Sequence, residues 1–216
     1  MSLRGKDMKY IIMAGGTYTK WDTPRQLLKI DGEMIIERTI RLLKENGVKD
    51  IAISTQNPIF EQFGLPILRH KNEYNANGYN DFTGNWNDAF YLMHEPVCYI
   101  FGDVVFSPEA IKTIVETETE DIEFFASAPP FSEHYYKDSA EPFAVKVVNN
   151  ERFEWAIHQT NFWYQLGKFN RKPIMWELWQ VIKGTPLNEI DYTNYTVIND
   201  YTCDVDEPED IEKIWI

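Results

Sequence analysis

The residues best suited to chemistry begin at a glycine pair near the N-terminus. An apolar run at 10–13 leads into a loop of small residues, and two cations follow closely: Ala14, Gly15, Gly16, Thr17, then Lys20 and Arg25. Glycine lets a backbone turn freely and approach a ligand closely. Successive N–H groups in such a loop form a concave anion site. The order indicates a loop that wraps a polyphosphate; an ordinary strand-to-helix turn with two solvated basic residues is the alternative.

An acidic residue stands at the end of a second apolar run. The segment 97–101 reads as a buried strand, and Gly102-Asp103 follows it directly. A carboxylate at a strand end can hold Mg²⁺ and direct it at phosphates, although Asp103 could instead cap the following turn. The formal net charge of −13 points the same way. Because bare carboxylates repel phosphate, a polyphosphate ligand would arrive with Mg²⁺.

Two stretches resemble the NTP-transferase (nucleotidyltransferase) superfamily with a GT-A-like fold. Its pattern of L-A-(A/G)-G-x-(G/S)-(T/S)-R followed by P-K is similar to Met13–Gly16, Thr19-Lys20 and Pro24-Arg25. Its pattern D-(I/V)-D-T-P-E-D-(L/I) is similar to 204–211, DVDEPEDI. Four positions depart from these patterns: Tyr18, Lys20, Arg25 and Glu207. The relatives include molybdenum-cofactor guanylyltransferase-like proteins, sugar-phosphate nucleotidyltransferases and phosphocholine cytidylyltransferases.

The resemblance implies a fold, a reaction and a set of roles. The fold is a three-layer α/β/α with a mixed, mostly parallel central sheet. An NMP group, CMP as the first guess, passes from an NTP to a phosphorylated small acceptor, such as a sugar phosphate or a phosphocholine-like molecule, with release of pyrophosphate. Catalysis rests on Lys20 and Arg25, and Mg²⁺ on Asp103 with Asp204 or Asp206, which face one side of an extended segment. The nucleotide contacts the loop of small residues, Asp103 and, by position in 72–87, Asn77, Gly78 and Asn85; a plain surface loop is the other reading of 72–87.

These residues need a framework of alternating strands and helices. The pattern predicts strands at 10–13, 51–54, 65–68, 97–101, 122–126 and 142–148, and helices at 35–43, 86–93, 173–182, after Ser107-Pro108 and after Pro208. Alternation of this kind favours a mostly parallel sheet covered on both faces. Such sheets bind ligands at the carboxyl ends of their strands, where the glycine loop would lie.

The region 150–185 changes in character because aromatic residues crowd it. We expect a helical subregion there whose aromatics form a core, or that lines the acceptor with aromatic faces and basic residues, since aromatic faces attract quaternary ammonium groups. The candidate acceptor residues are Lys146, Arg171 and Trp176. For Lys146, a place on a solvated face is slightly favoured over a contact with the acceptor phosphate.

Composition limits the remaining possibilities. We expect one domain over 8–216, with 44% hydrophobic residues and no apolar run long enough to span a membrane. The acidic balance argues against a nucleic-acid-binding surface. Two distant cysteines and no signal peptide fit a cytoplasmic protein. A GT-A glycosyltransferase that uses a nucleotide-sugar, a non-catalytic nucleotide-binding module and a structural interaction domain stay open, as does the oligomeric state.

Overall fold

A mixed sheet forms the centre of the protein in the computed structural model, which describes residues 5–15, 22–69, 86–128, 139–206, 208–212 and 214. The seven-stranded sheet has the order β10-β8-β9-β6-β1-β4-β5. Strands β1, β4, β5 and β6 run parallel, as do β8 and β10, whereas β9 runs antiparallel to both β6 and β8. The bounds are Lys9–Met13 (β1), Ile51–Ser54 (β4), Ile67–Leu68 (β5), Val97–Phe101 (β6), Ile122–Ser127 (β8), Glu141–Val147 (β9) and Thr196–Val197 (β10).

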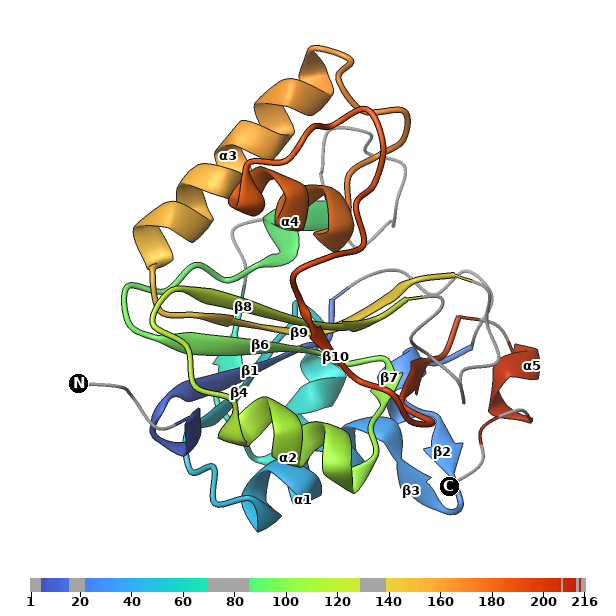
Figure 1. The fold of residues 1–216 in the computed structure, drawn as a ribbon. Helices are drawn as coiled ribbons and strands as arrows, with labels where there is room; N and C mark the ends of the chain where they lie inside the picture. Colours follow the sequence, from blue (N-terminus) through green and yellow to red (C-terminus); the bar gives the residue numbers. More distant parts are fainter. Residues whose placement is uncertain are drawn as a thin grey trace.

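Helices cover the two faces of this sheet. On one side lie α1 (Ile35–Glu45) and α2 (Pro108–Glu116), and on the other lie α3 (Asn150–Gln165) and α4 (Met175–Lys183) (Figure 1). The short helix α5 (Pro208–Ile211) stands apart from both layers (Figure 1). The predicted three-layer α/β/α fold with a mixed, mostly parallel sheet is therefore confirmed.

Local signals in the sequence account for most helix boundaries. The apolar residues of α1 repeat at helical spacing and are buried against the sheet. Helix α2 begins with Pro108 after Ser107, whose side chain accepts a hydrogen bond from the Ala110 N–H. Helix α4 ends at Lys183 and is capped by Gly184, which has φ of 72°. That backbone conformation favours glycine, so Gly184 accounts for the end of the helix.

The helix predicted for 86–93 is wrong beyond its first turn. Only a 3₁₀ turn forms, η4 (Trp86–Ala89). The carbonyl of Tyr91 accepts a hydrogen bond of 2.8 Å from the Tyr99 hydroxyl, on β6. Trp86 packs edge-on against Phe101 at 5.4 Å. Contacts with the neighbouring strand therefore decide the course of this segment, and its own helical periodicity does not.

Two small sheets hold the C-terminal segment against the end of β6. Strand β11 (Cys203–Asp204) pairs antiparallel with β7 (Val104–Val105), and β2 (Lys29–Ile30) pairs with β3 (Glu33–Met34). A second apolar cluster, separate from the main core, joins these pieces through Ile30, Ile35, Val105 and Val205. The Val205 N–H also donates to the Asp103 carbonyl at 3.1 Å. Residues about 100 positions apart in the chain thus share one edge of the molecule.

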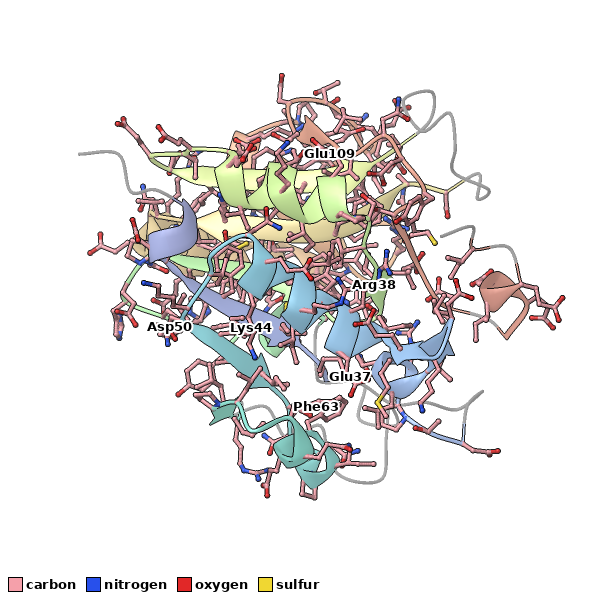
Figure 2. All side chains as sticks on the ribbon, turned by 90° about the horizontal axis from the view of Figure 1, so that it is seen from below. Glu37, Arg38, Lys44, Asp50, Phe63 and Glu109 are labelled. Atoms are coloured by element: carbon pink, nitrogen blue, oxygen red, sulfur yellow. The ribbon has the colours of Figure 1, made fainter. Side chains whose placement is uncertain are left out.

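The outer face of α1 carries mixed charges beside η3 (Pro58–Phe63). Figure 2 shows Glu37 and Lys44 of α1 next to Phe63. A hollow of about 300 Å³ lies there, lined by Glu37, Ile40, Arg41, Lys44, Glu45 and Phe63. None of these residues is a predicted site residue. Within the described ranges, no helix is both long enough and apolar enough to cross a bilayer; Cys98 and Cys203 are buried free thiols.

Candidate active site

The carboxyl ends of β1 and β6 meet at one edge of the sheet. The two strands pair in parallel as far as Met13 and Phe101, and the Gly102 N–H donates to the Met13 carbonyl at 3.0 Å. A Cβ atom at Gly102 would lie 2.4 Å from that carbonyl oxygen, so only glycine permits this approach. Gly102 therefore packs against the end of β1, and Asp103 follows it at the edge where the glycine loop leaves β1.

Arg25 connects the two acidic segments. It opens the 3₁₀ turn η2 (Arg25–Leu27) after Pro24. Its Nη2 lies 2.6 Å from Asp103 Oδ2, and its Nη1 lies 2.6 Å from Asp206 Oδ1. Nη1 also donates to the Val205 carbonyl at 2.9 Å. The planar guanidinium thus bridges the end of β6 and the segment after β11, which the sequence separates by about 100 residues.

The electrostatics of this pair follow from its partial burial. The side chains of Arg25 and Asp103 are each 23% exposed. Burial by itself lowers the pKa of Arg25, but the charges of Asp103, Asp206 and Asp204, with the hydrogen bond to Asp206, raise that pKa above its usual value. The guanidinium is therefore held in its charged form among carboxylates.

Three carboxylates form a second group around the same edge. One carboxylate oxygen from each of Glu141, Asp204 and Asp206 lies within 4.8 Å of the other two. Asp204 is buried at 8% exposure, and Glu141 is the first residue of β9. Glu141 is a site residue that the sequence reasoning missed. Because β9 runs antiparallel to β6, its first residue lies at the same edge as the last residues of β6.

Asp103 and Asp206 are brought together through Arg25, whereas Asp204 and Asp206 share the carboxylate group with Glu141. Among these described side chains, four carboxylates face a single guanidinium, so negative charge is in excess. An all-oxygen donor set of this kind suits a hard divalent cation such as Mg²⁺. The carboxylate of Asp210 instead accepts a hydrogen bond from the Asp206 N–H at 3.0 Å and so orders the start of α5.

Several predicted site residues lie outside the described part of the chain. Within it, Ala14 is buried and its N–H donates to the Ser54 carbonyl at 2.9 Å, and Gly15 follows it in the loop. The predicted residues outside the described ranges are Gly16, Thr17, Lys20, Asn77, Gly78 and Asn85, together with the pattern departures Tyr18 and Glu207.

Lys146 lies neither on a solvated face nor at the acceptor, so both sequence interpretations are wrong. It is 1% exposed. Its Nζ donates to the carbonyls of Val115 at 3.1 Å and Thr117 at 2.5 Å, at the end of α2. Burial lowers the pKa of this lysine. Its role is to satisfy carbonyls that the helix leaves unpaired at its C-terminus.

Trp176 belongs to the core and cannot contact an acceptor directly. It is 1% exposed and packs edge-on against Phe124 at 4.9 Å and Tyr195 at 5.3 Å. Its Nε1–H donates to the Ala140 carbonyl at 3.1 Å. The prediction of an aromatic acceptor contact at Trp176 is therefore wrong, but its hydrogen bond fixes the residue that precedes Glu141.

Arg171 is held at the start of α4. Its Nε lies 2.5 Å from Glu177 Oε1, and the other Glu177 oxygen accepts from the Ile174 N–H at 3.0 Å. Glu177 is buried, whereas the side chain of Arg171 is half-exposed. Contact between Arg171 and an acceptor stays a prediction.

Comparison with known proteins decides the family. The model of the MobA-like NTP transferase domain matches residues 10–172, which is most of the chain. The chain belongs to this family. Its class of reaction is accordingly nucleotidyl transfer. The match begins in β1 and includes the glycine loop, Arg25 and Asp103. A search of curated proteins gave no match.

Solved nucleotidyltransferases share the fold of this NTP transferase domain over nearly its full length. A putative glucose-1-phosphate thymidylyltransferase from Bacillus anthracis, in complex with a sucrose, is 15% identical with a TM-score of 0.59, covering 96% of this chain and 93% of its own. The inositol-1-phosphate CTP transferase from T. maritima is 14% identical with a TM-score of 0.58, covering 98% and 96%. The CTP:phosphocholine cytidylyltransferase from Streptococcus pneumoniae is 17% identical with a TM-score of 0.52, covering 95% and 96%.

Proposed function

We propose that the protein transfers an NMP group from an NTP to a phosphorylated small molecule in a Mg²⁺-dependent reaction that releases pyrophosphate. The observation that carries the proposal is the convergence of Arg25 and four carboxylates at the carboxyl ends of β1 and β6. In open α/β sheets this is the edge where ligands bind. The glycine loop that would cradle the phosphates leaves the sheet at the same place, after Ala14.

The residues of the chain would bind and orient the two reactants. The backbone of Gly15, Gly16 and Thr17 would bind phosphate oxygens. Lys20 and Arg25 would stabilise the charge that grows on the α-phosphate and on the leaving pyrophosphate. An acceptor phosphate oxygen attacks the α-phosphorus in line, the bond to the pyrophosphate oxygen breaks, and pyrophosphate carries away the electron pair. Positioning and charge stabilisation supply the catalysis.

The donor set fits the metal ion. Asp204, Asp206 and Glu141 already gather their oxygens within one small volume, and Asp103 stands on the other side of Arg25. These residues would hold Mg²⁺, which supplies charge neutralisation and polarises the phosphoryl group when bound. The excess of negative charge at the site supports this assignment, because unneutralised carboxylates would repel the incoming phosphates.

CTP is the first candidate for the nucleotide. Of the three neighbours described above, two are CTP-dependent transferases by name and one is a thymidylyltransferase. Their acceptors are glucose-1-phosphate, inositol-1-phosphate and phosphocholine, which are all small molecules with one phosphate. We therefore propose a cytidylyl transfer to a sugar phosphate, a polyol phosphate or a phosphocholine-like acceptor, with no aromatic contact from the buried Trp176.

Pyrophosphate release tests the proposal directly. Each of five nucleotides (CTP, dTTP, UTP, GTP and ATP) is incubated with choline phosphate, glucose-1-phosphate or inositol-1-phosphate. Every mixture is tested once with about 5 mM Mg²⁺ and once with about 5 mM EDTA, which removes Mg²⁺ from carboxylate ligands. We expect one nucleotide and one acceptor to release pyrophosphate and form the joined product, in Mg²⁺ only. Breakdown of a nucleotide-sugar without pyrophosphate release would instead identify a glycosyltransferase and overturn the proposal.

A pair of matched variants locates the activity. We expect Asp103→Asn to lower turnover by about 100-fold or more, the scale of losing one group that stabilises the transition state. Asp50→Asn is the control, because Asp50 is an exposed aspartate whose carboxylate pairs with Lys9 at 2.6 Å. Equal activity of the two variants would show that the site at the end of β6 does not carry the reaction.

A further inference from the structure

The outer face of α3 carries an apolar stripe that the fold leaves uncovered. Trp155, Phe162 and Leu166 are 52%, 54% and 55% exposed. Trp155 and Phe162 lie seven residues apart, about two turns of an α-helix, with His158 and Gln159 on the turn between them, and Leu166 caps the helix one turn beyond Phe162. The three side chains therefore lie along one line. The buried residues of the helix, Phe153, Ala156, Ile157 and Thr160, lie on another side. In Figure 1, α3 runs along the outer edge of the molecule with α4 on its inner side.

This apolar stripe is unusual for a surface helix. The outward side of such a helix normally carries charged and polar residues, whereas three of the seven large hydrophobic residues that are exposed in the described part of the chain lie on this one line. Half-exposed aromatic and leucine side chains of this size leave roughly 300–400 Å² of apolar surface on each molecule. The largest apolar patch on a typical monomer is of about this size and is often functional.

Charges at the two ends of the stripe select a second copy of this chain as its partner. Exposed Glu151 and Glu154 lie at the N-terminal end, and exposed Lys168 and Lys172 follow the C-terminal end. In an antiparallel pair of α3 helices, the end that carries Glu151 and Glu154 lies beside the partner's end, where Lys168 and Lys172 follow the helix. A parallel pair would instead bring glutamates against glutamates. The helix is therefore complementary to itself about a two-fold axis.

We propose that two copies of the protein associate through antiparallel packing of their α3 helices. Phe162 then lies next to the two-fold axis, near the partner's Phe162, and the acidic end of each α3 lies beside the basic end of the other. With roughly 700 Å² of apolar surface and the polar residues around it, the interface falls near the low end of specific interfaces. The dimer is consequently expected to dissociate on dilution, with a dissociation constant of roughly 1–100 μM, the weak range for an interface of this size.

Sedimentation velocity on the full chain, from about 1 to 200 μM protein, tests the proposal. The buffer contains about 0.15 M NaCl, which gives a Debye length of ~8 Å and so screens the repulsion between two acidic molecules. We expect wild type to shift from monomer to dimer across this range. Phe162→Glu should raise the dissociation constant by roughly 30-fold or more, as for a central aromatic residue. Ile59→Glu is the matched control, since Ile59 is 42% exposed but lies on η3.

Charge reversal separates this pairing from general stickiness of the surface. Glu154→Lys alone should weaken the dimer, because it places like charges opposite each other. The double variant Glu154→Lys with Lys168→Glu should restore it, because every interface contact then regains opposite signs. A monomer at every concentration, equal loss in Ile59→Glu and Phe162→Glu, or no restoration in the double variant would each overturn the proposal.

Discussion

Arg25 holds the carboxylates that are proposed to bind Mg²⁺, so the arginine and the metal ion should compete. Its two ion pairs join Asp103 and Asp206 at 2.6 Å each. In Arg25→Met the stem of the side chain is kept and the charge is removed. The acidic residues then repel one another without a counter-charge. We expect this variant to be less stable than wild type without Mg²⁺ and to gain more stability when Mg²⁺ is added.

The magnitude follows from the burial of the two pairs. The contact with the partly buried Asp103 is worth about 1.5–3 kcal/mol, as for a hydrogen bond to a charged group. The Asp206 side chain is 52% exposed, so its contact adds only about 0–1 kcal/mol. The two contributions add to about 1.5–4 kcal/mol, which lowers the melting temperature of a domain of this size by roughly 3–16 °C, at 2–4 °C per kcal/mol. Added Mg²⁺ then binds a site free of its internal cation and should recover about half of that loss or more.

Differential scanning calorimetry measures both effects in MgCl₂ from zero to ~10 mM. NaCl is adjusted to keep the ionic strength constant, because salt by itself screens the repulsion between the carboxylates. Arg41→Met is the control, since Arg41 of α1 also pairs with two carboxylates, that of Glu33 on β3 and that of Glu45 on α1, away from the candidate site. Its melting temperature should fall little and should not respond to Mg²⁺. An unchanged melting temperature in Arg25→Met, or an equal Mg²⁺ shift in all three proteins, would refute the competition.

Three further predictions concern residues that support the site. Lys146→Met should lower the free energy of unfolding in urea by about 1–3 kcal/mol, because buried carbonyls at the end of α2 lose their donor, while nucleotide binding by calorimetry is unchanged. The hydrogen bond from Arg41 lowers the pKa of Glu33; this stabilisation is present above the usual glutamate pKa of about 4.3 and is lost as pH falls through the lowered value. Arg41→Met should therefore be less stable than wild type at pH 7, and the difference should shrink as pH falls below the usual glutamate pKa, measured by urea unfolding. Trp176→Phe should lower stability by about 1 kcal/mol and weaken Mg²⁺ binding, measured by titration calorimetry, because the start of β9 at Glu141 loses its anchor.

The part of the candidate site that could be predicted from the sequence lies directly after a strand with a clear apolar pattern. Asp103 stands after an apolar run and a glycine, and the boundary of that run marks the end of β6. The Gly102 approach to Met13 then follows from parallel pairing of the two strands. The position of each residue depends on neighbours in sequence and on the general rule for α/β sheets, so a single sequence is enough.

The parts that could not be predicted depend on partners distant in sequence. Glu141 reaches the site only because β9 runs against β6, and nothing in 141–147 indicates its direction. Lys146 alternates with apolar residues in β9, as a residue on a solvated face would, but α2 covers that face and offers two carbonyls. In both cases the deciding fact is which element packs on the strand, and periodicity does not contain it.

The resembled pattern has lysine where this chain has Arg25, and the contacts of Arg25 give a physical reason for the difference. Nη2 and Nη1 reach Asp103 and Asp206 at the same time, while Nη1 also contacts the Val205 carbonyl. A lysine ammonium is a single point charge on a flexible stem and has no fork with which to span two carboxylates in fixed directions. Arginine therefore ties the C-terminal segment to the end of β6 before any ligand binds. Mg²⁺ at the proposed site would compete with Arg25 for the Asp206 carboxylate, which would link metal binding to the order of the segment that follows β11.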